Sequence, residues 1–482
     1  MKQDLKALDL ALKKKIEEKG CTGVSVCIRS PEGIVFEKGY GKRSVRDDLP
    51  VLPDTVFGCA SLTKSFTALT MCILHTEGVL DIDEPAVRFL PDLHVPGVPD
   101  ELVTLRQLAL HRAGIPLNEC LDWCIAVNTP GPYYQNDDRL RETCPNPMNT
   151  IDDIIEVIGE GAIRTLGEPG EYMSYCNESF ALLSSVADIA CGKPLEDFLQ
   201  ERIFDPLGMT RTALDLDGSR IEAITGGENV TNFFSDWPDG KHEDHQWTIC
   251  PPYKGCACLK STAEDMAKYY CMLANDGVFE GKQIVPPEAL ELMFGAEYPL
   301  RRKPFYAMGL RKHAIAGHMV CDHGGELHGV AAYGGFVKDG YGIAVLCNES
   351  EWDMEDVLNI CYAYLLDLPL EEDLIWTKPS GKEFSAPQML FGDYVGHVGD
   401  PIHIRVYARG GNSMPASPAK YAGWNTANRP CLLRSAKRAA SGSTSCASLS
   451  TTAAPGPSSA EACSTTGFRK GGLLLLSISS KN

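Results

Sequence analysis

The sequence has no long uninterrupted run of apolar residues near either end. Near its start, residues 5–19 place leucines and Ile16 at near-helical spacing with charged residues between them, a pattern that predicts an amphipathic helix rather than a signal peptide. Near its end, the run Leu473–Leu476 is far shorter than the roughly 20 apolar residues that a membrane span needs. We therefore expect a cytoplasmic protein that does not span a membrane.

The sequence also has fewer basic than acidic residues. The chain has 45 lysines and arginines against 64 aspartates and glutamates, which gives a formal net charge of -19 at pH 7. Binding to nucleic acid or to an anionic membrane surface would need a basic face. We expect neither partner, and we interpret the charge as an acidic, solvated surface.

The 19 cysteines lack the spacing of a zinc site. The pairs Cys120/Cys124 and Cys256/Cys258 have no second pair at ligand spacing, and no nearby histidine completes a set. The cysteines are scattered through segments that look helical or strand-like, and no export signal accompanies them. We predict reduced, mostly buried thiols and no metal site.

Acidic residues almost disappear from the last part of the chain. From Val406 onward Glu461 is the only one, against nine basic residues, and Ser, Ala, Thr, Gly and Pro dominate. Such a segment cannot bury enough apolar surface to offset chain entropy. We divide the chain into a main domain over 1–370, the start of a possible β-rich accessory domain over 371–405, and a low-complexity basic tail over 406–482. Two explanations of the tail stay open, namely disorder and reading out of frame.

The main domain is predicted to contain one antiparallel sheet built from both of its ends. Two β-rich runs flank the turn Ser30–Gly33, and two more flank the turn at Asp339-Gly340. With 482 residues, of which 44% are hydrophobic, the chain is long enough for a well-buried core. A mostly helical region lies between the two hairpins, so the predicted fold class is α+β.

Three segments of this helical region carry specific predictions. Residues 195–204 and 261–273 are expected to be helices, the second beginning with a capping box at Ser261–Glu264. Residues 117–149 are rich in Pro, Asn and Asp and are expected to form a long loop near the surface, of the kind that often borders an active site.

The strongest local motif is Ser61-Leu62-Thr63-Lys64, which leads into an apolar helical run. Positions i and i+3 share one face of a helix, so the hydroxyl of Ser61 and the amine of Lys64 can meet. A serine becomes a good nucleophile when a base removes its proton, and burial or nearby positive charge lowers the pKa of a lysine enough for that task.

Short motifs recur by chance, and this chain contains duplicates of each. Ser417-Pro418-Ala419-Lys420 repeats the spacing of Ser61 and Lys64 within the tail. Tyr-x-Asn occurs at Tyr134-Gln135-Asn136 and at Tyr175-Cys176-Asn177, and His-x-Gly occurs at His397-Val398-Gly399 and at His323-Gly324-Gly325. The longer context has to decide between the copies.

That context resembles the serine β-lactamase-related family, which also contains D-alanyl carboxypeptidases, D-aminopeptidases and esterases. Several blocks agree with the family in order over roughly residues 20–350, and the ordered set is more specific than any single motif. The matching blocks are Pro53–Thr55, Phe57–Ala68, Thr104–Leu108, His111–Pro116, Pro169–Asn177, Ile203–Met209, Ser261–Met266, and His323–Gly325 with Gly329. The resemblance implies a β-lactamase/transpeptidase-like fold.

The resemblance also implies the roles of the site residues. Ser61 would be the nucleophile, and Lys64 and Tyr175 its proton-transfer partners. Asn177 would hydrogen-bond the substrate amide or Lys64. The oxyanion hole would consist of the backbone N–H groups of Ser61 and Glu326.

The third motif carries the remaining substrate-binding residues. Gly324 and Gly325 would let the substrate approach the strand closely. His323 stands where many β-lactamases carry a lysine that attracts the substrate carboxylate, and a mostly neutral histidine attracts it more weakly. We interpret His111 as structural, because it lies in a packing block.

The expected activity is that of a serine hydrolase acting through a Ser61 acyl-enzyme on amide or ester bonds, most of all on D-amino-acid peptides or amides, with weak β-lactam hydrolysis. A broad-specificity carboxylesterase and a non-catalytic, penicillin-binding-like scaffold protein are the alternatives. No cofactor is implied, because side chains, backbone donors and water suffice for this chemistry. The expected partner is a small-molecule or short-peptide substrate, and the sequence predicts no particular oligomeric state.

Overall fold

The structure is a computed structural model. It describes residues 4–131, 138–161, 165–237, 240–295, 298–299, 305–338, 340–350 and 354–370, together with the backbone of three strands after residue 391. The chain divides into two compact units, Met1–Ile375 and Trp376–Asn482.

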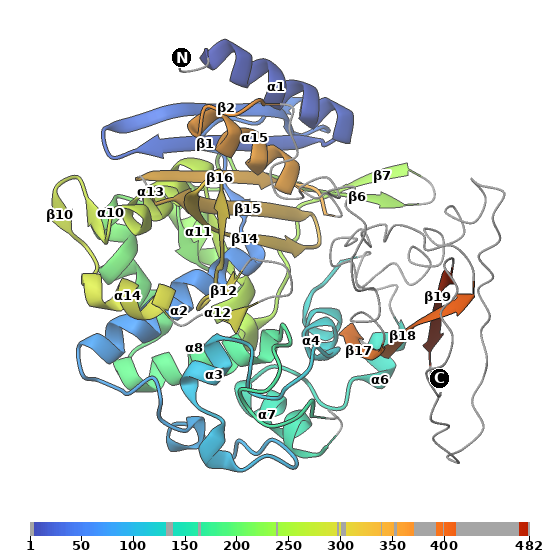
Figure 1. Cartoon of the computed structure of the whole chain (residues 1–482). Coiled ribbons are helices and arrows are strands. Elements are labelled where there is room, and N and C mark those ends of the chain that lie inside the picture. The colour runs from blue at the N-terminus through green and yellow to red at the C-terminus, as the bar shows by residue number, and fades with distance from the viewer. Residues whose placement is uncertain are drawn as a thin grey trace. The chain divides into compact units, whose positions relative to one another are not determined.

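A nine-stranded antiparallel sheet forms the centre of the first unit, in the order β11-β12-β13-β14-β15-β16-β1-β2-β3 (Figure 1). Its strands are β1 (Gly23–Ser30), β2 (Gly33–Ser44), β3 (Leu49–Pro50), β11 (Tyr298–Pro299), β12 (Phe305–Tyr306), β13 (Arg311–Ile315), β14 (His318–Leu327), β15 (Val330–Val337) and β16 (Tyr341–Cys347).

Strand β1 pairs with β16 in register from Val24↔Cys347 to Arg29↔Gly342. Both predicted hairpins are therefore present, and they join the two ends of the first unit into one sheet. The predicted α+β fold with an inserted helical region is confirmed.

The alternation of side chains along β1 explains why this sheet has a packed layer on each face. Val24, Val26 and Ile28 belong to a core shared with the helices α1 (Leu5–Lys19) and α15 (Glu355–Leu365), whereas Cys27 belongs to the larger core on the other face. Successive residues of a strand point to opposite faces, so a strand that is buried throughout supplies both layers. Helix α1 buries Leu8, Leu12 and Ile16, as its spacing predicts.

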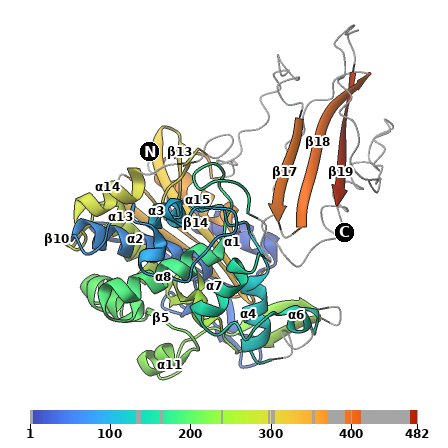
Figure 2. The same ribbon diagram turned by 90° about the horizontal axis from the view of Figure 1, so that it is seen from below.

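Most of the helical region lies at the end of the unit away from α1 (Figure 1) and in front of the strands in Figure 2, although its helix Ala263–Ala274 packs on the sheet against β1, β15 and β16. Its helices are α2 (Thr63–Thr76), α3 (Leu105–Ala109), α4 (Cys120–Asn128), α6 (Asp138–Thr143), α7 (Ile151–Gly159), α8 (Asn177–Cys191), α9 (Leu195–Leu199), α10 (Asp205–Leu207), α11 (Ser219–Thr225), α12 (Lys254–Ala257), α13 (Ala263–Ala274) and α14 (Pro287–Gly295). Short strands lie between them, namely β4 (Phe57–Gly58), β5 (Ala213–Leu214), β6 (Phe233–Trp237), β7 (Gly240–Asp244), β8 (Leu259–Ser261), β9 (Val278–Phe279) and β10 (Lys282–Gln283).

Helix α2 is buried along nearly its whole length. It packs against α8, α12 and α14. The residues that open α2 are therefore held from several sides, which is what a catalytic constellation needs.

The predicted capping box at Ser261 is wrong by one residue. Ser261 is the last residue of β8, where it pairs with Phe57. The cap of α13 is Thr262, whose side chain accepts a hydrogen bond from the N–H of Asp265. Ser261 is therefore part of the strand, and the helix begins one residue later than predicted.

The long loop predicted over 117–149 is also wrong in part. The helices α4 and α6 lie within it, and residues 132–137 are outside the described residues. Helix α4 forms because Cys120, Cys124 and Ile125 fall on one buried face, which outweighs the turn-forming residues around it. Over 195–204 the predicted helix is present as α9 followed by a π-helical turn, Gln200–Phe204.

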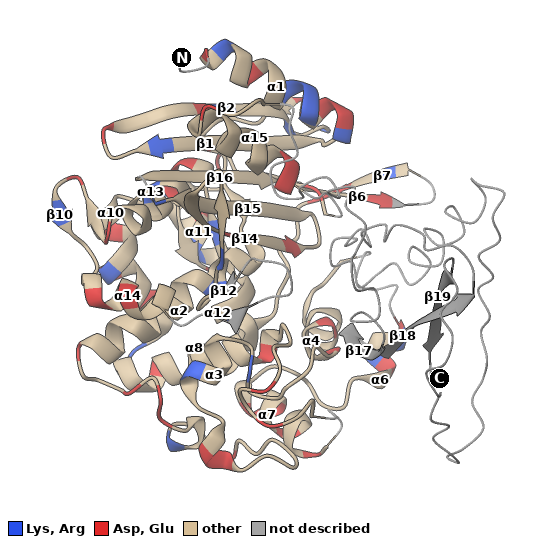
Figure 3. Cartoon of the chain, viewed as in Figure 1, with Lys and Arg blue, Asp and Glu red and all other residues tan. Residues whose placement is uncertain are grey.

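Acidic and basic residues are interspersed along the outer elements of the first unit, whereas the central strands contain few of them (Figure 3). Most of the described cysteines are buried and remain thiols, among them Cys59, Cys176 and Cys256. No helix within the described ranges combines the length and the apolar character that crossing a membrane requires.

The second unit contains β17 (Gly392–Val398), β18 (Asp400–Gly410) and β19 (Gly472–Ser480), which form a three-stranded antiparallel sheet (Figure 2). Residues 411–471, which make up most of the predicted basic tail, lie outside the described residues. The domain boundaries at 370 and 405 and the nature of the tail stay predictions.

Candidate active site

A tight turn directly before α2 presents the predicted nucleophile. Residues Ala60–Leu62 form a 3₁₀ turn, and Ala60 has a φ of 44°, a left-handed value that is uncommon for a residue with a side chain. Such strain persists only where the surroundings hold it, and it concentrates at functional sites.

Hydrogen bonds from the neighbouring strand hold this turn. The N–H of Cys59 donates to the carbonyl of Leu259 at 2.9 Å. The hydroxyl of Thr63 donates to the carbonyl of Ala60 at 2.6 Å and accepts from the N–H of Leu259 at 3.1 Å. Ser61 is thereby held at the start of α2 and stays partly exposed.

The predicted contact between Ser61 and Lys64 is present. Nζ of Lys64 lies 3.0 Å from Oγ of Ser61, 2.9 Å from Oδ1 of Asn177 and 3.3 Å from the backbone oxygen of Cys256. The lysine side chain is 0% exposed. The amine thus has three fixed hydrogen-bond partners, and one of them is the nucleophile.

Burial lowers the pKa of Lys64, because an ammonium group loses its hydration in this position. The buried carboxyl of Glu178 acts in the opposite direction on the pKa of Lys64, but burial dominates. A lysine with a lowered pKa can exist as the neutral amine, which is the form that accepts a proton from Ser61.

Tyr175, just before α8, and Asn177, the first residue of α8, both lie at Lys64. Nζ of Lys64 lies 4.8 Å from the centre of the Tyr175 ring, and the hydroxyl oxygen of Tyr175 is buried. Burial raises the pKa of Tyr175, and a hydrogen bond with Ser61 offsets only part of the rise. The environment therefore favours a neutral amine on Lys64 and a protonated hydroxyl on Tyr175.

Strand β14 passes directly beside the turn that carries Ser61. A Cβ atom placed on Gly325 would lie 2.6 Å from the oxygen of Cys59 and 2.8 Å from the backbone nitrogen of Ser61. Only glycine allows this approach. The backbone around Glu326, which the sequence pairs with Ser61 as oxyanion donor, thus lies close to Ser61, and the side chain of Glu326 is exposed.

The pairing of the same strand changes beside the site. Within the described residues, β14 pairs with β13 only up to Asp322↔Arg311 and continues to pair with β15 as far as Leu327↔Val330. The segment from His323 onward therefore has a strand on one side and the turn of Ser61 on the other. A peptide-like substrate could add to such an edge.

His323 is nearly buried, with 6% exposure. Its Nε2 lies 3.3 Å from the hydroxyl of Tyr306, and its Nδ1 contacts the carbonyl oxygen of Gly324. Burial, together with the charge of Lys64, lowers the pKa of His323 to about 3. The ring is therefore neutral at pH 7.

His111, which the sequence places in a packing block, lies against Tyr175. Its ring centre is 4.4 Å from that of Tyr175, and its Nδ1 accepts a hydrogen bond from the N–H of Cys176 at 3.1 Å. Nε2 of His111 lies 3.1 Å from the hydroxyl of Tyr306. The residue is buried, as a packing role requires, but its ring nitrogens contact Cys176, next to Tyr175, and Tyr306.

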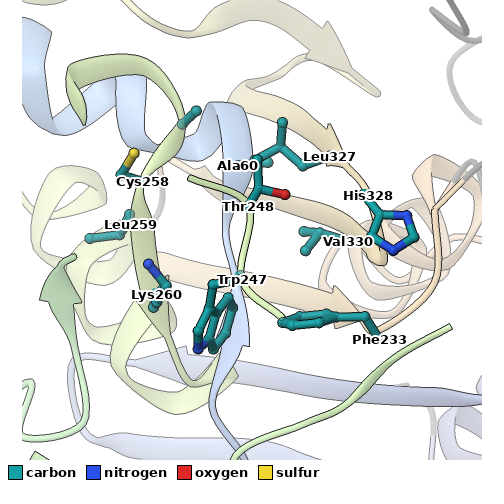
Figure 4. Close-up of a pocket in the computed structure, with 12 residues that line it drawn as sticks. Ala60, Phe233, Trp247, Thr248, Cys258, Leu259, Lys260, Leu327, His328 and Val330 are labelled. Atoms are coloured by element: carbon teal, nitrogen blue, oxygen red, sulfur yellow. The ribbon is translucent and has the colours of Figure 1, made fainter. Parts of the chain in front are cut away.

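A small pocket opens beside Ala60 and the end of β14 (Figure 4). The rings of Phe233 and Trp247 meet edge to face in its wall, with 4.6 Å between centres. Its volume of about 20 Å³ is room for roughly one water molecule. The residues that line it are Gly58, Ala60, Phe233, Trp247, Thr248, Ala257, Cys258, Leu259, Lys260, Leu327, His328 and Val330.

The duplicate motifs take no part in this constellation as far as the structure describes them. Tyr134 and Ser417 fall outside the described residues, and His397 lies in β17 of the second unit. The copies selected by context, at 61–64, 175–177 and 323–325, lie together.

Three contributors to the site were missed in the sequence. They are the backbone carbonyl of Cys256, the hydroxyl of Tyr306 and the buried carboxyl of Glu178, which accepts hydrogen bonds from Cys176 and Tyr253. Glu178 directly follows the Tyr-x-Asn motif, so only its burial was unexpected. No local signal marks Tyr306 or the carbonyl of Cys256.

Comparison with known proteins identifies the family. The family model described as beta-lactamase matches residues 8–363, which is well over half of the chain. The chain belongs to the beta-lactamase family, a family of serine hydrolases, and the resemblance inferred from the sequence motifs is confirmed.

The individual relatives are distant. Penicillin-binding protein 4* of Bacillus subtilis (strain 168) is 26% identical over 249 residues, which are 50% of this chain and 50% of that protein. The D-aminopeptidase of Brucella anthropi is 24% identical over 323 residues, which are 64% of this chain and 52% of that protein. The chain thus spans about half the length of the curated relatives it matches.

Among solved structures, the octameric penicillin-binding protein homologue from Pyrococcus abyssi is similar in fold. It superposes with a TM-score of 0.67 at 24% identity, over 84% of this chain and 86% of that chain. The predicted β-lactamase/transpeptidase-like fold is confirmed.

Proposed function

We propose that this protein is a serine hydrolase in which Ser61 attacks an amide or ester carbonyl and forms an acyl-enzyme. The observation that carries the proposal is the fully buried amine of Lys64, 3.0 Å from Oγ of Ser61. A buried lysine whose hydrogen bonds go to a hydroxyl, an amide oxygen and a backbone carbonyl rather than to a carboxylate is costly for a fold. Activation of a serine is the chemistry that uses a neutral amine in this position.

In the acylation step, the neutral amine of Lys64 takes the proton of the Ser61 hydroxyl while Oγ attacks the carbonyl carbon. The negative charge that develops on the carbonyl oxygen is stabilised by the N–H groups of Ser61 and Glu326. The protonated amine returns its proton through the hydroxyl of Tyr175 to the leaving nitrogen or oxygen, and the bond to the leaving group breaks. An ester of Ser61 and the free leaving group result.

In the deacylation step, water attacks the ester carbonyl and gives its proton to Lys64 through the hydroxyl of Tyr175. Collapse of the second tetrahedral intermediate returns this proton to Oγ of Ser61 and releases the acid. Asn177 holds the amine of Lys64 in line with Ser61 throughout, through the hydrogen bond of 2.9 Å.

The preferred substrates are D-amino-acid peptides or amides. The similarity to the D-aminopeptidase of Brucella anthropi supports this class. The neutral His323 supports it as well, because a carboxylate next to the scissile bond would meet no positive charge on this residue. For the same reason, β-lactams, which carry such a carboxylate, are expected to be poor substrates.

The pocket beside Ala60 is proposed to receive the side chain of the acyl group. Ala60, which precedes Ser61, and Leu327, which follows Glu326, line this pocket, and its small volume suits a methyl group better than a ring. We therefore expect D-alanyl substrates to react faster than D-phenylalanyl substrates. The proposed partner is a small molecule or short peptide, the proposed location stays the cytoplasm, and the chemistry needs no cofactor.

The nucleophile is tested by intact mass after exposure to a fluorophosphonate. One adduct is expected on the wild type and none on Ser61→Ala. Ser417→Ala is the matched control, because Ser417 stands in the second Ser-x-x-Lys motif, and this variant should label like the wild type. Absence of an adduct on folded wild-type protein would contradict the proposal.

The substrate class is tested by comparing kcat/KM on D-alanine p-nitroanilide, L-alanine p-nitroanilide, p-nitrophenyl acetate and nitrocefin. We expect the D-amide to exceed both the L-amide and nitrocefin. A preference for the ester with no discrimination between D and L amides would identify a carboxylesterase instead.

A further inference from the structure

A buried chain of hydrogen bonds connects the segment that carries Tyr175 with strand β14. It runs from the N–H of Cys176 to Nδ1 of His111 (3.1 Å), from Nε2 of His111 to the hydroxyl of Tyr306 (3.1 Å), and from that hydroxyl to Nε2 of His323 (3.3 Å). It ends at the contact between Nδ1 of His323 and the carbonyl oxygen of Gly324. Both ring nitrogens of each histidine are used.

The two ends of the chain fix the direction of every hydrogen bond in it. A backbone N–H can only donate, so Nδ1 of His111 carries no proton, and the proton of the neutral ring is on Nε2. A carbonyl oxygen can only accept, so Nδ1 of His323 carries the proton and Nε2 does not. Tyr306 then accepts from His111 and donates to His323, which satisfies every member once.

Both histidines are held in the neutral state. Burial, followed by the charges of Lys64 and His323, places the pKa of His111 well below its usual value. Burial and Lys64 lower the pKa of His323 to about 3, with Arg311 on β13 acting in the same direction and Asp322 on β14 in the opposite one. A second proton on His111 would place its Nδ1 proton against the N–H of Cys176, so that two donors would face each other. A second proton on His323 would reverse its hydrogen bond with Tyr306 and leave the hydroxyl proton of Tyr306 without its acceptor.

We propose that Tyr306 is a positioning residue, which locks His111 and His323 in single neutral tautomers and thereby fixes Tyr175 against the substrate strand. The inference rests on the proposed function of Tyr175. The hydroxyl of Tyr306 hydrogen-bonds to the two histidines and acts on the site through them.

The contacts around His111 explain how Tyr306 reaches the catalytic tyrosine. The ring of His111 packs on Tyr175 with 4.4 Å between centres, and the backbone of His111 has a left-handed φ of 55°. The carbonyl of His111 also accepts the N–H of Ser174 at 2.9 Å. His111 therefore holds the residues before and after Tyr175, and Tyr306 fixes its ring.

The chain also assigns His323 a different task from direct binding of a substrate. Its two nitrogens are occupied by Tyr306 and by Gly324, so the ring supplies shape and a fixed strand backbone rather than a hydrogen bond to the substrate. His323 differs in this respect from a lysine at the same position, because the lysine would present a free ammonium group to the substrate.

The tautomers can be measured on the wild-type protein by ¹⁵N NMR of the histidine rings at pH 7. Spectra of His111→Gln and His323→Gln assign the two rings. We expect a protonated Nε2 on His111 and a protonated Nδ1 on His323. A proton on Nε2 of His323, or an imidazolium on either ring, would overturn the proposal.

The positioning role is tested with Tyr306→Phe, which keeps the ring and removes the hydroxyl. We expect kcat to fall by about 10-fold or more with little change in KM, because a small misplacement of a catalytic group is costly. The pKa of His323, followed by ¹⁵N NMR, should rise, because His323 loses the donor that favours its neutral form. Unchanged kcat and an unchanged pKa of His323 would overturn the proposal.

The matched control is Tyr40→Phe, which removes a tyrosine hydroxyl that donates to Asp9 at 2.8 Å between β2 and α1. It should leave kcat and the pKa of His323 as in the wild type. The two proposals fail separately. If wild-type Ser61 does not react with a fluorophosphonate, the hydrolase proposal fails while the NMR measurement still decides the tautomers. If Ser61 reacts and the tautomers differ from those expected, only the present inference fails.

Discussion

The amine of Lys64 donates a hydrogen bond of 2.9 Å to the amide oxygen of Asn177, so this buried amine faces a neutral partner at a position where the similar-sized side chain of aspartate would also fit. Because an amide carries no charge, Asn177 leaves in place the lowering of the pKa of Lys64 that burial causes. Replacing this amide with a carboxylate should therefore shift the acid limb of the pH profile.

For Asn177→Asp we expect the acid limb of kcat/KM to move to higher pH. A carboxylate within hydrogen-bond distance stabilises the ammonium form and typically shifts such a pKa by about 1–3 units. Measured at a pH below the limb, activity should fall by about 10-fold or more, and part of it should return at high pH. Asn275→Asp, at the end of α13, is the control and should keep the wild-type profile. A loss of activity that is the same at every pH would contradict the electrostatic explanation.

Gly325→Ala is expected to reduce kcat/KM by about 100-fold or more, which is the effect of losing an oxyanion donor. The added methyl group would lie 2.6 Å from the oxygen of Cys59 and 2.8 Å from the nitrogen of Ser61, so either β14 or the turn of Ser61 has to move. Steady-state kinetics and thermal unfolding should be measured together. Gly295→Ala is the matched control, because a Cβ there meets no atom within 4 Å. Wild-type kinetics in Gly325→Ala would show that the strand does not form one wall of the oxyanion hole.

The predictable part of this fold is the part that local patterns determine. The hairpins at 23–44 and 330–347 follow from alternating β-rich residues around a turn, and Leu8, Leu12 and Ile16 follow from helical spacing. The sequence does not correctly predict that Ser261 lies in a strand or that helices form within 117–149. The pairing of Ser261 with Phe57 and the burial of Cys120 and Cys124 depend on residues far away in the sequence.

The same division holds within the site. Ser61 and Lys64 are three residues apart on one turn, so their contact can be predicted from spacing alone. The meeting of Tyr306 with His111 spans 195 residues and results from β12 lying next to the loop after α3, which no local pattern encodes. The catalytic roles of Ser61, Lys64, Tyr175, Asn177 and the residues 323–326 stay predictions until they are tested by substitution.

Trp247→Ala is expected to change which acyl groups the protein accepts. The indole forms one wall of the pocket beside Ala60, and the pocket has room for roughly one water molecule as it stands (Figure 4). Removing it should raise the ratio of kcat/KM for D-phenylalanine p-nitroanilide over D-alanine p-nitroanilide by about 10-fold, in line with the modest discrimination that apolar pockets provide. Trp247→Phe, which keeps an aromatic wall, should change the ratio much less. An unchanged ratio in Trp247→Ala would place the acyl side chain elsewhere.

The buried histidines also predict how stability depends on pH. An unfolded histidine takes up a proton below about pH 6.5, whereas the pKa of His323 in the folded protein is lowered to about 3 by burial and by Lys64. Between these two values the unfolded state binds more protons, so the free energy of unfolding falls as the pH falls, by up to about 1.4 kcal/mol per pH unit for each such ring. The contribution of His323 is complete above about pH 6.5 and is lost progressively down to about pH 3.

Urea unfolding of the wild type and of His323→Gln from pH 7 to pH 4 measures this contribution to the free energy of unfolding, with His245→Gln on the exposed surface as the control. We expect His323→Gln to lose less stability than the wild type over this range, because the variant has no proton to take up at this position; equal losses would mean that His323 is charged in the folded protein.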